Sequence, residues 1–201
     1  YHYLKRPYTL VPLTAAEMPA PVYLNAQGER LNAEAPAEQV AFSLYEIKIQ
    51  PGIRYQPHPA FAHDSGGRTL YHTLGPEGRE LTAEDYVYQI KRLAHPKIHS
   101  PIYGFMSDYI VGLRELGETL RKAQEKAEPG AFLDLREYPL SGVKVVDRYT
   151  YRIKVVGKYP QFLYWLAMPF FAPIPHEADR FYSQPGLIEK NITLDWYPIG
   201  T

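Results

Sequence analysis

The sequence contains no cysteine among its 201 residues. This absence excludes disulfide bonds, thiolate metal sites and a cysteine nucleophile. Neither charge sign is in excess, because Lys plus Arg and Asp plus Glu both number 22. Nucleic-acid-binding proteins usually carry a basic excess, and polybasic runs favour anionic membranes. We therefore expect neither nucleic acid nor a membrane surface as a partner.

Long apolar runs are also missing. The longest strongly apolar stretch, 162–171, is much shorter than the roughly 20 residues that span a bilayer. Residue 1 is Tyr, and the basic, apolar and small-residue pattern of a signal peptide does not follow it. We expect a chain that is soluble as given, from which any export signal has been removed.

Tyrosine and proline are abundant, at 18 and 19 residues. Tyr offers a large amphipathic surface, and Pro at this density implies many extended segments and turns. Two interpretations stay open: a recognition surface, or a loop-rich domain without a special surface. A chain of this length buries roughly 70% of its unfolded surface, so it can form a core without covalent cross-links.

Alternating apolar residues predict four strands, at 22–24, 40–49, 143–146 and 149–156. In 149–156 the alternation is regular, with Tyr151, Ile153 and Val155 on one face. In 40–49 it is interrupted, which predicts a bulge or a change of face.

Helical spacing predicts helices at 81–94, 109–126, 160–168 and 176–182, followed by an extended tail at 184–201. The first has Thr82 as its N-cap and Asp85 in capping-box position. Gly, Pro and His between residues 54 and 80 predict a loop. Together these elements predict an α+β fold in which helices cover a small, mainly antiparallel sheet.

Five motifs follow one another in a known order. The helix at 81–94 resembles the T-A-x-D-V-x5-R-L motif of the family 5 solute-binding proteins, which serve peptide, dipeptide and nickel ABC importers. The further matches are 100–103 with the family's Ser-Pro-Tyr segment, 145–153 with its V-x-D-x-x-T-x-x-I strand, 160–178 with its Pro-aromatic helix and Pro-x-Pro element, and 198–201 with the start of its P-I-G-T-G-P strand.

The resemblance implies that residues 1–201 form one lobe, like the family's domain II, of a longer periplasmic-binding-protein-like fold of type II, cluster C. It implies capture of an oligopeptide-like solute and delivery to ABC permease subunits in the inner membrane. The location would be the periplasm, or the outer side of the membrane as a lipoprotein, and the protein would be a monomer. Nickel complexes and other solutes also occur in the family.

The sequence departs from the family at two places. Residues 54–80 replace a short Phe-His-Asp-Gly-like turn, so we expect an inserted loop there, and the first 38 residues match poorly. Both departures leave the identity of the solute open.

The resemblance also places a ligand-binding segment at Ser100, Pro101, Ile102 and Tyr103, because the matching residues approach the cleft in peptide-binding relatives. Here Ile102 interrupts the Ser-Pro-Tyr order, so either Ile102 or Tyr103 takes the place of the family's Tyr. The alternative is a packed loop after a helix.

Catalytic and metal-binding patterns are weak. Four side chains in the loop at 54–80 are possible metal ligands, but their spacing matches no compact zinc pattern: His58, His63, Asp64 and His72. Glu84 and Asp85 lie where helix-capping carboxylates are expected. The sequence contains neither a G-x-S-x-G elbow nor a phosphate-binding loop. We predict no catalytic residue, no metal and no cofactor. The alternatives left open are a metal-dependent hydrolase and a protein-interaction module.

Overall fold

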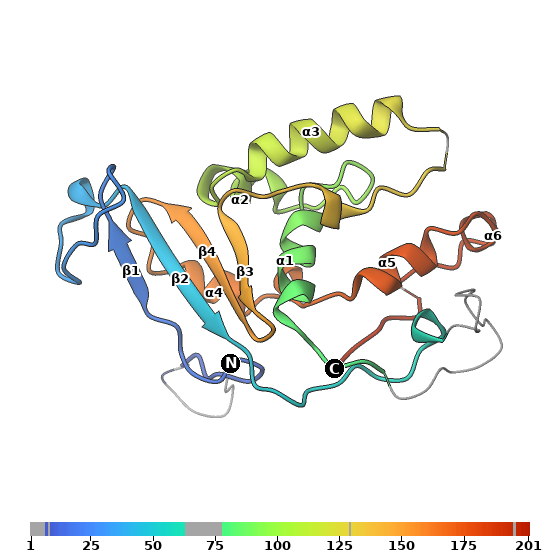
Figure 1. The fold of residues 1–201 in the computed structure, drawn as a ribbon, viewed down its shortest axis with the longest axis horizontal. Helices are drawn as coiled ribbons and strands as arrows, with labels where there is room; N and C mark the ends of the chain where they lie inside the picture. The colour runs from blue at the N-terminus through green and yellow to red at the C-terminus, as the bar shows by residue number, and fades with distance from the viewer. Residues whose placement is uncertain (1–6, 8, 63–77, 129, 195) are drawn as a thin grey trace.

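The computed structural model of the protein describes residues 7, 9–62, 78–128, 130–194 and 196–201. Its centre is one antiparallel sheet (Figure 1). The strands are β1 (Pro21–Leu24), β2 (Phe42–Lys48), β3 (Val143–Asp147) and β4 (Thr150–Val156), in the spatial order β1-β2-β4-β3. Helices pack on this sheet, so the predicted α+β fold with a small antiparallel sheet is confirmed.

The helices lie on one side of the sheet and beyond its β3 edge (Figure 1). They are α1 (Ala83–Arg92), α2 (Tyr103–Tyr109), α3 (Leu113–Lys126), α4 (Phe162–Leu166), α5 (His176–Tyr182) and α6 (Pro185–Glu189). Short 3-10 turns occur at Ala37–Gln39, Pro59–Phe61, Leu135–Glu137 and Pro169–Phe171. Among the described residues, none of the helices has the length and apolarity needed to cross a membrane.

Strand β2 runs through the middle of the sheet without a bulge. Its register with β4 is continuous from Phe42 opposite Val156 to Lys48 opposite Thr150. The predicted bulge or change of face is therefore wrong. The buried face includes Ser43, which a pattern of apolar residues does not reveal, and its hydroxyl donates to the carbonyl of Gly157 at 2.6 Å.

Strands β3 and β4 form the predicted pair, and the register shift of the sheet lies in β3 between Val145 and Asp147. Tyr151, Ile153 and Val155 are buried on one face, as their alternation predicts. This face of β4 therefore forms the centre of the hydrophobic core.

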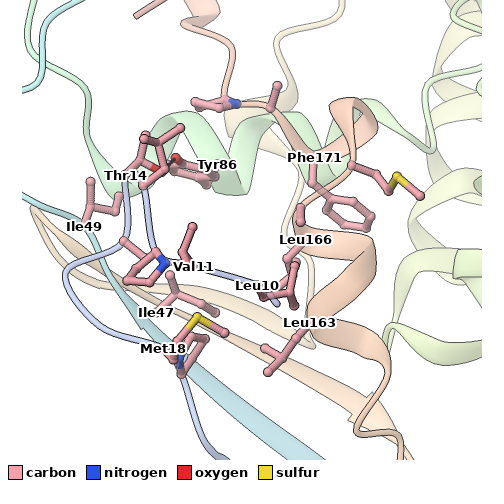
Figure 2. Close-up of a pocket in the computed structure, with 18 of the residues that line it drawn as sticks. Leu10, Val11, Thr14, Met18, Ile47, Ile49, Tyr86, Leu163, Leu166 and Phe171 are labelled. Atoms are coloured by element: carbon pink, nitrogen blue, oxygen red, sulfur yellow. Dashed lines mark hydrogen bonds between the residues drawn. The ribbon is translucent and has the colours of Figure 1, made fainter. Parts of the chain in front are cut away.

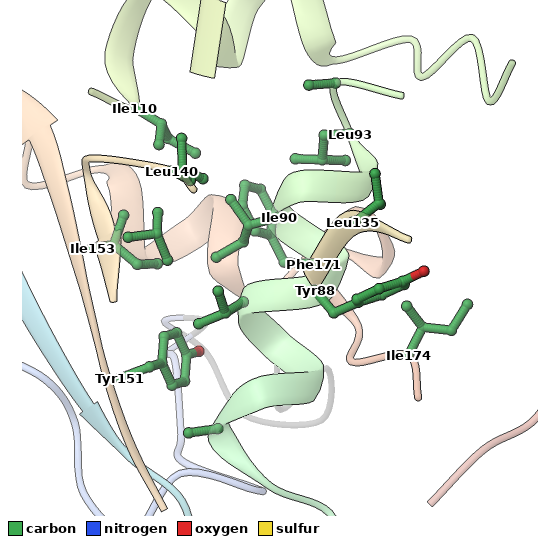
Figure 3. Packing of buried hydrophobic residues seen from close by; sticks show 14 of the residues in the cluster. Tyr88, Ile90, Leu93, Ile110, Leu135, Leu140, Tyr151, Ile153, Phe171 and Ile174 are labelled. Carbon is green, nitrogen blue, oxygen red and sulfur yellow. The ribbon is translucent and has the colours of Figure 1, made fainter. Parts of the chain in front are cut away.

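Helix α1 covers that face. The capping box is present, and the Asp85 carboxylate accepts a hydrogen bond from the Thr82 backbone N–H at 2.9 Å. Figure 3 shows Ile90 of α1 between the sheet residue Ile153 and Leu135 of the connection after α3. The capped, amphipathic sequence of α1 thus predicts both its start and its buried stripe.

The predicted helix at 109–126 is wrong in its first turn. The segment contains the end of α2, a break at 110–112, and α3. Gly112 has φ +81°, a left-handed conformation that glycine adopts without strain. At the break Ile110 pairs with Val155 of β4, so the chain touches the sheet before α3 begins.

The C-terminal part contains more helix than the sequence predicts. Helices α4 and α5 lie where expected, but α6 occupies part of the tail at 184–201 that was expected to be extended. Pro185 stands in the first turn of α6, where its missing N–H costs nothing.

Candidate functional site

The predicted ligand-binding segment forms a turn between α1 and α2. The backbone N–H of Tyr103 donates to the Ser100 carbonyl at 3.2 Å, and Ile102 precedes the first residue of α2. Ile102 is buried in the main core, whereas Pro101 is exposed. The Ser100 hydroxyl oxygen is buried and has no hydrogen-bond partner among the described residues.

The side chain of Tyr103 packs against α3. Its ring and hydroxyl lie where a Cβ on Gly117 would stand, so the missing side chain of Gly117 makes room for it. The structure therefore explains Ile102 and Tyr103 as packing residues. The role of the segment in ligand binding stays a prediction.

Four aromatic rings pack together, two from α2, which follows this segment, and two from residues 159–165. The centroids of Phe105 and Trp165 are 5.1 Å apart, and Tyr109 stacks on Tyr159 at 4.5 Å. The indole N–H of Trp165 donates to the Tyr159 hydroxyl at 2.7 Å. We call these four rings the aromatic cluster. Its rings come from segments about 50 residues apart, so the sequence pattern did not reveal it.

A network of charges, one buried and two half-buried, joins α1 to α5. Arg79 donates to Asp85 at 2.9 Å and to Glu177 at 2.6 Å, and its guanidinium lies 5.6 Å from the centre of the Tyr55 ring. Burial disfavours the Glu177 carboxylate, but the hydrogen bonds from Arg79 outweigh burial, so the pKa of Glu177 is below its ordinary value.

The charged groups of this network are paired with one another. Asp85 is 1% exposed and pairs with both the helix N-terminus and Arg79, whereas its neighbour Glu84 is exposed. The two carboxylates thus do not form an acid–base pair. The network therefore links α1 and α5 through ion pairs and has a structural role.

Both ring nitrogens of His58 lie within hydrogen-bonding distance of neighbouring groups. Its Nδ1 accepts a hydrogen bond from the backbone N–H of Ala60 at 3.0 Å, and its Nε2 lies 2.8 Å from the Tyr182 hydroxyl. Burial lowers the pKa of His58. The other three possible metal ligands, His63, Asp64 and His72, lie outside the described residues. Within the described ranges, no group of three or more His, Asp or Glu side chains is placed to hold a metal ion.

Two curated proteins of Escherichia coli strain K12 are similar in sequence. The probable deoxycholate-binding periplasmic protein YgiS is 27% identical over 154 residues, covering 72% of this chain and 26% of YgiS. The periplasmic oligopeptide-binding protein OppA is 30% identical over 128 residues, covering 60% of this chain and 21% of OppA. The chain thus spans roughly a quarter of the length of the curated relatives it matches. No family model matches the sequence.

Two solved structures are similar in fold. One is Listeria monocytogenes OppA bound to peptide, with 17% identity, a TM-score of 0.50, and coverage of 86% of this chain and 23% of that chain. The other is the pheromone receptor PrgZ, with 18% identity, a TM-score of 0.50, and coverage of 94% of this chain and 26% of that chain.

The class follows from the fold: the chain has the fold of one part of a peptide-binding protein of the OppA type. The sequence matches to OppA and YgiS agree with this fold and support the resemblance to the family 5 solute-binding proteins. These four relatives are named as binding proteins or a receptor, and none of them as an enzyme.

Proposed function

We propose that this chain is one lobe of a longer extracytoplasmic protein that captures peptide-like solutes for an ABC importer. The observation that carries the proposal is the similarity in fold to peptide-bound OppA, which extends over 86% of the chain. The ordered motifs between residues 81 and 201 support it independently, because they rest on sequence alone.

The lobe would act as a scaffold and as one wall of the cleft. Its sheet, α1 and the network of charges at Arg79 form one packed unit, which suits a rigid body that moves as a whole. In a hinge-closing protein the ligand shifts the population toward the closed state by its difference in affinity for the two states. In this proposal Ser100 and Pro101 border the solute, and Ile102 and Tyr103 hold the turn in place.

The loop at 54–80 would be an insertion into this lobe. Its ends lie together, because the Tyr55 N–H donates to the Arg79 carbonyl at 3.0 Å and the Leu81 N–H donates to the Ile53 carbonyl at 2.8 Å. Most of its length, residues 63–77, lies outside the described residues. An insertion with closed ends can be accommodated without disturbing the strands beside it.

Peptides are the solute class that we propose. The names of the relatives offer two classes, oligopeptides for OppA and deoxycholate for YgiS. The two similar folds are a peptide complex and a pheromone receptor for which a mode of peptide binding is described. The partners would be the permease subunits of the inner membrane, with a monomer acting in the periplasm or as a lipoprotein.

Mass spectrometry tests this function directly. The natural polypeptide that carries this chain would be purified without added solute and denatured, and the released small molecules would be identified. We expect peptides in near-stoichiometric amount. A protein that releases no peptide, and instead hydrolyses a substrate in a reaction that stops on chelation, would contradict the proposal.

A substitution at the turn tests the site within the same polypeptide. Pro101→Glu should weaken binding of the identified peptide and leave the urea midpoint unchanged, because Pro101 is exposed. Pro36→Glu, at an exposed proline outside the predicted segment, is the matched control and should change neither. Equal effects of the two substitutions would remove Pro101 from the site.

A further inference from the structure

An apolar pocket of about 510 Å³, partly open to solvent, lies between the sheet, α1, α4 and the N-terminal segment 10–19; we call it the cavity. Figure 2 shows its walls. Side chains from the N-terminal segment, β2, α1, β4 and residues 163–173 line it, among them Leu10, Met18, Ile47, Leu163, Leu166 and Phe171. This volume lies within the range of about 300–1,000 Å³ typical of small-molecule pockets.

The N-terminal wall is anchored to the end of β2. The Ala16 N–H donates to the Lys48 carbonyl and the Gln50 N–H donates to the Thr14 carbonyl, both at 2.8 Å. The side-chain amide of Gln50 also donates to the carbonyl of Leu13 at 3.2 Å. Residues 14–16 of this segment are therefore held against the end of β2 by backbone hydrogen bonds, which fixes the segment beside the cavity.

The lining contains no charged side chain among the described residues. Its side-chain oxygens are the hydroxyls of Thr14, Tyr86 and Tyr151. A charged group enclosed here would lose its hydration without gaining a counter-ion, which is costly. The enclosed part of any occupant must therefore be uncharged.

One end of the cavity can form a directed hydrogen bond. The Thr14 and Tyr86 hydroxyl oxygens are 2.6 Å apart, and the two side chains lie together in Figure 2. Their mutual hydrogen bond uses one of the two hydroxyl protons, so one O–H remains able to donate. An acceptor oxygen on an occupant matches this free donor.

We propose that this cavity binds a neutral amphiphile, with an apolar body between the sheet and α4 and one hydroxyl oxygen at the Thr14–Tyr86 end. We infer a neutral occupant because the lining carries no charge, an apolar body because most lining side chains are apolar, and a polar end because the hydroxyl pair can donate a hydrogen bond. The site does not depend on peptide capture, because its walls all belong to this chain.

Fluorescence titration of this 201-residue chain tests the site with a neutral apolar probe, N-phenyl-1-naphthylamine. We expect saturable binding and displacement by 1-decanol. Decanoate and decylammonium have the same chain length but carry a charge, and should displace the probe at least about tenfold less well because their head groups are poorly accommodated.

Three variants locate the binding. Ala167→Trp places a large ring at the exposed rim of the cavity and should abolish probe binding. Ala33→Trp, at an exposed alanine outside the lining, is the matched control and should bind normally. The double variant Thr14→Val with Tyr86→Phe removes both hydroxyls of the pair, and should weaken decanol about fivefold while the probe binds as before, because only the hydrogen bond is lost. Circular dichroism and a urea transition confirm that each variant is folded.

Four results would overturn the proposal. The first is an absence of saturable probe binding, and the second is displacement by decanoate as strong as by decanol. The third is sedimentation of the chain as a dimer that Ala167→Trp dissociates, because a second copy would then fill the cavity. The fourth is binding in this chain but not in the natural polypeptide, which would show that another segment covers the cavity.

Discussion

At the scale of single residues, Arg79 brings several interactions together at one side chain. Its guanidinium neutralises two carboxylates, one of them almost inaccessible to water, and lies over the rings of Tyr55 and Phe61. Removing one partner of a buried ion pair leaves an uncompensated charge, which costs more than the pair contributes. Arg79 therefore contributes to holding α1 and α5 together, beside two hydrogen bonds that side chains of α1 donate to Asp179 of α5 at 2.8 and 3.1 Å.

Arg79→Leu should lower the free energy of unfolding by about 3 kcal/mol, because Asp85 and Glu177 lose their counter-ion. Urea denaturation measures the change. Arg114→Leu is the matched control, since Arg114 pairs with Asp108 on the surface and should lose far less. Equal losses in the two variants would mean that the Arg79 network stabilises the protein no more than a surface ion pair does.

Three buried or half-buried histidines predict a dependence of stability on pH. Burial lowers the pKa of His58, His95 and His176. The unfolded chain takes up these protons near pH 6.5, whereas the folded chain resists them, so lowering the pH favours unfolding.

We expect the free energy of unfolding to fall between pH 7.5 and pH 5.5, a window above the range in which the carboxylates titrate. Urea denaturation at both pH values measures the change. His58→Gln should reduce the difference between them, because one of the resisting groups is removed. If the unsubstituted chain had the same free energy of unfolding at both pH values, this account would be contradicted.

At the scale of elements, the break between α2 and α3 depends on one backbone conformation. Gly112 has φ +81°, and a Cβ there would overlap with the Ser141 side chain. Gly112→Ala should cost at least about 1 kcal/mol, for strain and for overlap. Gly104→Ala, within α2 and with open space around it, should be neutral or slightly stabilising. A neutral Gly112→Ala in thermal or urea unfolding would mean that the break is not required.

The packing of α2 on α3 can be tested with a double-mutant cycle. Gly117→Ala should destabilise the protein by about 1–3 kcal/mol, because the new Cβ meets the Tyr103 ring. In the Tyr103→Ala background the same change should stabilise the protein by up to about 1 kcal/mol, because alanine is the better helix former. The same sign in both backgrounds would show that Tyr103 does not pack on α3.

The sequence predicted the elements whose signals are local. Capping at Thr82 and the alternation of 149–156 describe α1 and β4 well, because both patterns are determined by neighbours along the chain. The break at Gly112 was missed, since a glycine in a helical pattern looks only like a weak helix former. Ser43 in the core was missed for a different reason: its partner, Gly157, is 114 residues away.

At the scale of the whole molecule, the sequence motifs and the observed fold indicate the same fold class. The ordered motifs predicted a fold of the solute-binding-protein type, and the similarity to OppA and PrgZ shows that fold, while the assignment to one lobe stays a proposal. The aromatic cluster, the Arg79 network and the apolar cavity could not be predicted, because each is assembled from segments brought together only by the fold.

If the chain is one lobe of a longer polypeptide, as proposed, its share of the cleft determines how it should bind. A clamping protein shares its ligand between lobes, so a single lobe keeps only part of the contacts. Isothermal titration calorimetry with the peptide identified by mass spectrometry compares this chain with the natural polypeptide that contains it. We predict that the isolated chain binds that peptide at least about 100-fold more weakly, corresponding to about 2.7 kcal/mol of lost contacts. Equal affinity in the two proteins, or no binding of peptide by the natural polypeptide, would contradict the account.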